Sequence, residues 1–218
     1  MPSQTKENYL KAIFSISQKK DNISITELSE IMQVSKPTAN SMVKKMQDKG
    51  WVVYEKYKPL KLTSKGQTEA ALIVRKHRLA EMFLAKIMDF GWEEVHDIAE
   101  EMEHLQSTKL FDRMDEILGF PTEDPHGSPI PDKLGTIIKP TYLNLTTLKE
   151  GEQAKLSGLT NSSKDLLMFL NKKNISLGTK FTVEEIEPFD KSLKIKLQNK
   201  TSIMLTFEVS QCLLVEKD

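Results

Sequence analysis

The sequence predicts an α+β protein of several domains: an N-terminal winged helix-turn-helix, a helical middle part and a small C-terminal β-barrel. Three observations lead to this fold class. Apolar residues recur at helical spacing through most of the first 118 residues, interrupted by one hairpin-like stretch after residue 50. A Pro/Gly-rich segment follows at 120–135. Beyond residue 141 most apolar residues alternate as they do in β-strands.

The first 66 residues have the element order of a winged helix-turn-helix. Apolar spacing predicts a helix over 6–19, and Thr26 is expected to cap the next one. Ser35 is well placed as the N-cap of a further helix, which ends before Gly50. The stretch "WVVYEKYKPLKLT" then predicts two strands around a Lys/Pro turn. In this fold the helix after Ser35 is the one that enters the major groove of DNA.

The outward face of that helix suits contacts with DNA, because its residues are small and polar or cationic. Residues 1–66 carry 12 Lys/Arg and 6 Asp/Glu, and this excess of positive charge favours a phosphate-rich partner. The alternative is a helical hairpin with a solvated, Lys-rich face. The residues predicted to contact DNA are Ser35, Lys36, Pro37, Thr38, Asn40, Ser41, Lys44, Lys45, Lys56 and Lys58.

Three helices are expected in the middle part, with apolar residues marking 72–87, 95–105 and 110–118. Their apolar surface has to be buried among themselves or against a second copy of the chain. The predicted domains are 1–66, 67–140 and 141–218. In the last domain "KFTVEEIEP", "SLKIKLQ" and "SIMLTFEV" are expected to be strands, and "KDLLMFLNKK" a short helix.

Composition limits the classes of protein that this chain can represent. Of 218 residues, 31 are Lys/Arg and 31 Asp/Glu, but the negative charge is concentrated in the middle part. No apolar run approaches the length of a membrane span, and the N-terminus has no signal-peptide pattern. Because Cys212 is the single cysteine, no internal disulfide can form, and a cytoplasmic location is expected.

The stretch "VHDIAEEMEHL" (95–105) is a candidate for metal binding. At about 100° per residue, His96, Glu100, Glu103 and His104 share one stripe beside the apolar face. In "RKHRLAE", on the preceding helix, a histidine and a glutamate again stand one turn apart. Mixed nitrogen and oxygen ligands on two helices suit a first-row divalent metal. The alternative is a solvated acidic face, and these residues alone leave both readings open.

Four motifs resemble the diphtheria-toxin-repressor family of metal-dependent transcriptional repressors, including its manganese-responsive members. They are "VSKPTANSMVKKM", "RKHRLAE", "VHDIAEEMEH" and "PHGSPIP". The resemblance spans essentially the whole chain. It implies a helical dimerisation domain in the middle and an SH3-like domain at the C-terminus.

The resemblance also implies metal ligands. A primary site would comprise Asn8, His77, Glu100, Glu103 and His104. A second site would comprise Glu81, Asp124, His126 and Asp165. His96 corresponds to a histidine of the ancillary site in iron-type members, which also uses the positions of His77 and Glu81.

Three positions depart from one branch of the family or the other. Glu100 stands where iron-type members have Cys, which favours a hard ion such as Mn²⁺. Asn8 stands where manganese-type members usually have Asp, so it adds no charge. Lys11 replaces a carboxylate and is expected to lie outside the site. The predicted cofactor is therefore Mn²⁺, with Fe²⁺ as the alternative and Zn²⁺ as a non-physiological occupant.

The resulting hypothesis is a repressor of metal-ion homeostasis and not an enzyme. Metal binding would order a homodimer for a palindromic operator in double-stranded DNA. A metal-dependent hydrolase is one alternative, since "EEMEH" superficially resembles the H-x-x-E-H pattern, but Glu100 occupies the place of its first histidine. A metal-buffering interaction protein without DNA binding is the other alternative.

Overall fold

The computed structural model describes residues 4–20, 22–55 and 58–217, so Lys56 lies outside the described residues. They form two compact units. The first contains the described chain up to Ala80 with Ala99–Ile117 and Ile130–Ile138, and the second contains Glu81–Ile98, Leu118–Pro129 and the described chain from Lys139 on. Helices α4 (Ser64–Ile87) and α5 (Val95–Met102) contribute to both. None of the described helices combines the length and apolar character that crossing a membrane requires.

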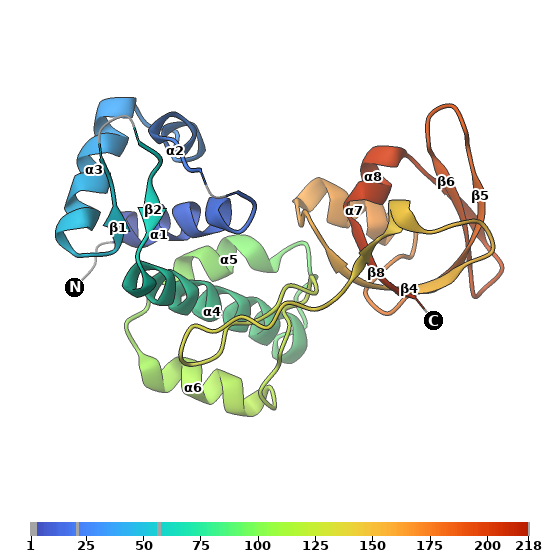
Figure 1. Ribbon diagram of the computed structural model, residues 1–218. Coiled ribbons are helices and arrows are strands. Elements are labelled where there is room, and N and C mark those ends of the chain that lie inside the picture. The colour runs from blue at the N-terminus through green and yellow to red at the C-terminus, as the bar shows by residue number, and fades with distance from the viewer. Residues whose placement is uncertain (1–3, 21, 56–57, 218) are drawn as a thin grey trace. The chain divides into compact units, whose positions relative to one another are not determined.

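The first unit begins with the predicted winged helix-turn-helix (Figure 1). Its elements are α1 (Gln4–Ser17), α2 (Ile25–Ile31), α3 (Lys36–Asp48) and the antiparallel strands β1 (Val52–Val53) and β2 (Lys61–Leu62). Helix and wing share one core, in which Leu10, Ile13, Leu28, Val43 and Leu60 are fully buried. This core fixes α3 with its polar residues outward.

One predicted cap is confirmed and another is wrong. The Ser35 hydroxyl caps α3 by accepting a hydrogen bond from the Thr38 N–H at 3.3 Å. The cap of α2 is Ser24 rather than Thr26, since the Glu27 N–H donates to the Ser24 hydroxyl at 3.1 Å. The reason lies in the preceding residue: Ile23 pairs with Leu60 in a β-bridge, so the change from extended to helical backbone falls at Ser24.

Helix α4 carries the structure from the wing into the helical part of the first unit. Its N-terminal half packs on the winged-helix core through Ala70, Ala71, Ile73 and Val74. Farther along, Arg75 donates to a carboxylate oxygen of Asp115 in α6 (Thr108–Ile117) at 2.5 Å, and to the Pro131 carbonyl at 2.6 Å. These contacts fix α6 and the 130–138 segment against α4.

The C-terminal part of the second unit is an antiparallel sheet of six strands in the order β3-β8-β4-β5-β6-β7. Alternate residues of the strands form its core, together with Leu167 and Leu170 of the helix α7, which is present as predicted. The elements are β3 (Leu143–Asn144), the 3-10 turn η1 (Leu145–Thr147), β4 (Gln153–Leu159), α7 (Lys164–Lys172), β5 (Lys180–Ile186), β6 (Leu193–Leu197), β7 (Ser202–Leu205), α8 (Phe207–Gln211) and β8 (Leu213–Lys217).

The strand expected over "SIMLTFEV" is correct only in its first half. Strand β7 ends at Leu205, and the Thr206 side chain then accepts a hydrogen bond from the Val209 N–H at 3.3 Å. This cap starts the short helix α8, so residues 207–209 are helical. The fold class itself is confirmed, with a helical N-terminal part and a β-rich C-terminal part.

Candidate metal centre

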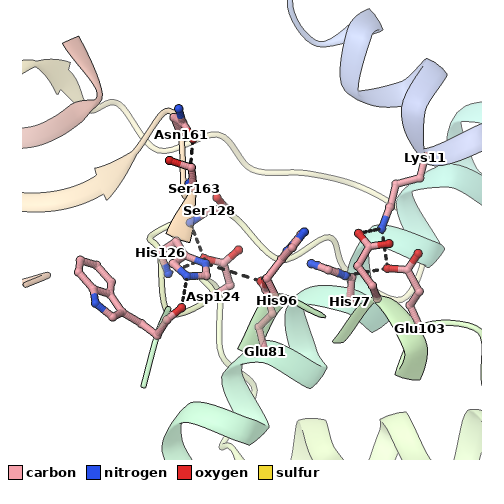
Figure 2. A network of polar contacts seen from close by, with 12 residues as sticks. Lys11, His77, Glu81, His96, Glu103, Asp124, His126, Ser128, Asn161 and Ser163 are labelled. Carbon is pink, nitrogen blue, oxygen red and sulfur yellow. Dashed lines mark hydrogen bonds and ion pairs between the residues drawn. The ribbon is translucent and has the colours of Figure 1, made fainter. Parts of the chain in front are cut away.

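Polar contacts of the first unit converge on Glu103, just after the end of α5. Its side chain is fully buried, with no exposed area. One carboxylate oxygen, Oε2, lies 2.8 Å from Lys11 Nζ and 2.7 Å from His77 Nδ1 (Figure 2). The other, Oε1, is buried with no hydrogen-bond partner. Ligand atoms of His77, Glu100 and Glu103 lie within 4.8 Å of one another, as the prediction of a shared site requires.

Lys11 lies inside this cluster, and the expectation that it lies outside is wrong. Its ammonium is 2.5 Å from Glu100 Oε1 and 2.8 Å from Glu103 Oε2. Two neighbouring carboxylates, one of them fully buried, repel each other unless a cation lies between them. Lys11 supplies that cation from α1, and its side chain is only 20% exposed.

Helix α1 contributes two more groups. Asn8 Oδ1 is buried without a hydrogen-bond partner, which is unusual for an amide oxygen. Glu7, which sequence reasoning missed, is buried, and its Oε2 lies 2.5 Å from His104 Nδ1. A signal was available, because Glu7 and Lys11 are one turn apart and Asn8 and Lys11 three residues apart, so all three share one side of the helix.

The Tyr9 hydroxyl, on the same helix, is also buried without a hydrogen-bond partner. Burial raises the pKa of this hydroxyl above its ordinary value. Tyr9 therefore adds no charge to the helix at neutral pH.

A second group of potential ligands lies in the second unit. Ligand atoms of Glu81, Asp124 and His126 are within 4.8 Å of one another, and all three residues are buried. His126 Nε2 donates to the Trp92 carbonyl at 2.8 Å, so its Nδ1 faces the carboxylates, at 3.8 Å from Glu81 and 4.0 Å from Asp124 (Figure 2). Asp124 Oδ1 in turn accepts the backbone N–H groups of His126 and Ser128.

Gly127 fixes the loop that carries His126. Its φ of +79° is unfavourable for residues with a side chain, and an added Cβ would lie 2.2 Å from the Ser157 carbonyl oxygen on β4. The Leu159 N–H donates to the His126 carbonyl at 3.0 Å and closes this contact. The "PHG" sequence therefore allows a close approach of backbone to backbone that holds the imidazole in place.

The remaining two predicted ligands lie differently. The His96 side chain is 53% exposed, with its Nδ1 3.3 Å from Glu81 Oε1. Asp165 is exposed in the first turn of α7, and in the described part of the chain the buried group contains Glu81, Asp124 and His126 without it. The role of both residues as ligands stays a prediction.

The donor atoms of both groups fit a divalent cation. Each combines imidazole nitrogen with carboxylate oxygen, the mixture that first-row divalent metals accept. In the first unit the unpartnered oxygens of Asn8 and Glu103 provide an independent indication, because buried oxygens without a partner are costly unless a cation completes them.

Helix α3 presents the predicted DNA-contacting residues to solvent. The exposed ones are Ser35, Lys36, Pro37, Thr38, Ser41, Lys44, Lys45 and, on the wing, Lys58, while Asn40 is half-buried. The residues that line an open groove on this face include Lys36, Asn40, Lys44 and Tyr54. Lys58 forms an exposed ion pair with Glu55 at 2.6 Å. Such pairs contribute little stability, so a DNA phosphate can easily replace Glu55 as the partner of Lys58.

Three family models match successive parts of the chain. They are described as "Iron dependent repressor, N-terminal DNA binding domain" for residues 1–60 and "Iron dependent repressor, metal binding and dimerisation domain" for residues 63–132. The third is "FeoA domain" for residues 143–217, in agreement with the predicted SH3-like domain. The finer domain limits at 66/67 and 140/141 stay predictions.

Relatives of known function are similar over long stretches. The iron-dependent repressor IdeR of Mycobacterium tuberculosis (strain H37Rv) is 28% identical over 225 residues, covering 98% of this chain and 97% of that protein. IdeR of Mycobacterium leprae is 35% identical over 130 residues, covering 60% of this chain and only 56% of that protein. A solved structure described as a manganese-dependent transcriptional repressor in complex with manganese is 30% identical, covers 98% of this chain and 100% of that one, and has a TM-score of 0.86.

Proposed function

Since this chain belongs to the iron-dependent repressor family, whose members are metal-dependent, DNA-binding transcriptional repressors and not enzymes, we propose that Mn²⁺ switches it to a DNA-binding homodimer. Its target would be a palindromic operator in genes of metal-ion homeostasis. Iron-named and manganese-named proteins both occur among the relatives, so the assignment of Mn²⁺ is an inference from the ligand types.

The observation that carries the proposal is the meeting of α1 with α4 and α5 at one buried carboxylate. Lys11 of α1 contacts Glu100 and Glu103, and Glu7 of α1 contacts His104. Helix α1 belongs to the winged helix, whereas His77 lies on α4 and Glu103 just after the end of α5. A metal ion held by groups from both sides therefore ties the DNA-binding helices to the dimerisation helices.

Such a tie can control DNA binding through geometry. The two recognition helices of a dimer have to reach half-sites about one turn of DNA apart, or a multiple of it. A chain that samples several angles between its winged helix and its dimerisation helices meets this condition only part of the time. The ion selects the competent arrangement to the extent that it binds this arrangement more tightly than the others.

The ligand types favour Mn²⁺ over Fe²⁺. Glu100 and Glu103 at the first site and Glu81 and Asp124 at the second supply hard carboxylate oxygens, and no thiolate is among them. We assign the second group, with Asp165 as an additional ligand, to a further regulatory ion. Zn²⁺ would bind as well, because affinity for most sites follows the Irving–Williams order rather than function.

The test uses a palindromic duplex selected from a random DNA pool by the full chain in the presence of Mn²⁺. The wild type should shift this duplex only with metal, whereas Glu103→Ala and His104→Ala should lose the metal-dependent shift and still sediment as dimers. Glu101→Ala is the matched control, because Glu101 is an exposed carboxylate near the end of α5, two residues before Glu103. Metal-independent binding by the wild type would contradict the proposal, and a hydrolase or buffer would select no duplex.

A further inference from the structure

Both ring nitrogens of His104 face carboxylates, and one of them is hydrogen-bonded. Nδ1 lies 2.5 Å from Glu7 Oε2, and Nε2 lies 3.8 Å from Glu103 Oε1, the oxygen that has no hydrogen-bond partner. The second oxygen of Glu7 is also engaged, since it accepts from Gln106 Nε2 at 3.2 Å. Gln106 Nε2 donates to the His104 carbonyl as well, at 3.1 Å. Glu7, Gln106 and His104 thus form one closed network.

The position of Glu7 opposes a role as a ligand. The two ring nitrogens point away from each other, so an ion bound at Nε2, on the side of Glu103, lies across the ring from Glu7. The group formed by the ligand atoms of His77, Glu100 and Glu103 does not include Glu7. Glu7 therefore acts on the site through the ring of His104.

The chemistry of the contact determines where the ring carries its proton. An ionised carboxylate only accepts hydrogen bonds, so Nδ1 has to donate to Glu7. In the neutral imidazole this leaves the lone pair on Nε2, facing the unpartnered oxygen of Glu103. A carboxylate on the far nitrogen fixes the tautomer and the ring orientation, and it makes the near nitrogen a stronger donor to a metal ion.

We propose that Glu7 is the positioning residue of the metal-sensing site: from α1 it fixes His104 with Nε2 toward Glu103 and provides the negative charge that Asn8 lacks. This inference rests on the proposed metal-dependent function. An ion at Nε2 would withdraw electron density from the ring and strengthen the Nδ1–H bond to Glu7. Metal binding at His104 would thus tighten a hydrogen bond to α1, the first helix of the DNA-binding part.

The experiment compares the full-length wild type with Glu7→Gln, Glu7→Ala and the control Glu101→Gln. In the metal-free proteins, ¹⁵N-labelled imidazole rings report the tautomer of His104, and four histidines keep the assignment simple. The wild type and Glu7→Gln should show the Nδ1–H tautomer, because a glutamine oxygen also accepts. Glu7→Ala should show a mixture of the two tautomers.

Mn²⁺ affinity is then measured from the electron paramagnetic resonance signal of the free ion. Loss of such an outer-shell partner typically lowers metal affinity about 10–100-fold, which is the expected effect of Glu7→Ala. Glu7→Gln should lose less, and Glu101→Gln should bind as the wild type does. The isosteric Glu7→Gln keeps the test valid if the alanine variant folds poorly.

Two results would overturn the inference. If Glu7→Ala keeps the wild-type tautomer and Mn²⁺ affinity, Glu7 has no positioning role. If Glu7→Gln and Glu7→Ala lose affinity equally while the tautomer stays unchanged, Glu7 is itself a ligand. Failure of the proposed function is separate: a wild type that binds no Mn²⁺ would refute that function, while a tautomer that depends on Glu7 would still support the contact.

Discussion

Replacing Lys11 by Met should destabilise the metal-free chain and at the same time raise its affinity for Mn²⁺. The Lys11 ammonium lies between two carboxylates, at 2.5 Å from Glu100 and 2.8 Å from Glu103. Its positive charge therefore offsets the repulsion between the two carboxylates, as a metal ion bound by both of them would. Removing it leaves the carboxylates repelling each other, and an added divalent ion relieves that repulsion.

The magnitude follows from the two distances. At an effective dielectric constant of about 20, each ion pair contributes roughly 6 kcal/mol of Coulomb energy before desolvation is counted. Desolvation of a buried carboxylate offsets most of this gain. Glu100 is 36% exposed, so solvent weakens its pair further. We expect a net loss of about 2 kcal/mol in the free energy of unfolding without metal, and a roughly tenfold gain in Mn²⁺ affinity, equivalent to about 1.4 kcal/mol.

Urea denaturation with and without Mn²⁺ measures the first quantity, and titration of free Mn²⁺ by electron paramagnetic resonance measures the second. Lys6→Met is the matched control, because it removes the same charge from the same helix and leaves both ion pairs intact. The two effects of Lys11→Met have opposite signs. A variant that loses stability and also loses Mn²⁺ affinity would refute the idea that Lys11 competes with the metal.

Three further predictions follow from single contacts. Lys44→Ala should weaken binding to the selected duplex and reduce the salt slope of log K by about one, measured by fluorescence anisotropy across a salt series. Gly127→Ala should lower stability by at least about 1–2 kcal/mol in urea denaturation and reduce Mn²⁺ stoichiometry, because its Cβ would meet the Ser157 carbonyl. Asp115→Asn should cost about 3 kcal/mol in the same assay, since it leaves the Arg75 guanidinium, 13% exposed, without its carboxylate. Each prediction would be contradicted if the variant gave the same measured value as the wild type.

Apolar periodicity predicted the helical part of the fold well because each helix buries one continuous stripe. In α3 the buried residues Ala39, Val43 and Met46 repeat at intervals of three and four, and Ser35 stands at the helix start. The α2 cap was readable too: "SITE" has Ser24 and Glu27 at capping-box spacing, which favours Ser24 over Thr26. The sequence signal for Ser24 was therefore present, two residues before the predicted cap Thr26.

Helix α8 could not be predicted in the same way. Its five residues, Phe207–Gln211, are too few to establish a helical period, and its first residue continues the apolar pattern of β7. Only the cap at Thr206 separates the two elements. Tertiary contacts with the turn η1 and the strand β8 then hold α8 in place, and contacts between distant segments are not encoded in a local pattern.

In the candidate site, too, local patterns could be predicted and contacts between distant segments could not. Helical spacing identified candidate ligands within single helices, because Glu100, Glu103 and His77 each lie about one turn from another histidine or carboxylate. It could not determine which residues of α1 reach them across about 90 positions of sequence. Lys11 was expected outside the site because it replaces a carboxylate of the family, and Glu7 was overlooked. The structure brings Lys11 to Glu100 and Glu103, and Glu7 to His104.

The orientation of the histidine rings is the part of the site that depends most on the fold. At His104 a carboxylate from α1 takes Nδ1, so Nε2 faces Glu103. At His126 the Trp92 carbonyl takes Nε2, so Nδ1 faces Glu81 instead. The two clusters therefore present opposite ring nitrogens to their carboxylates, although both histidines follow an acidic residue closely in the sequence. The hydrogen-bond partner on one ring nitrogen thus decides which nitrogen is free to bind a metal ion. A ligand motif in the sequence therefore does not specify the geometry of a site. For the same reason, loss of Glu7 should directly change how His104 presents Nε2 to the metal.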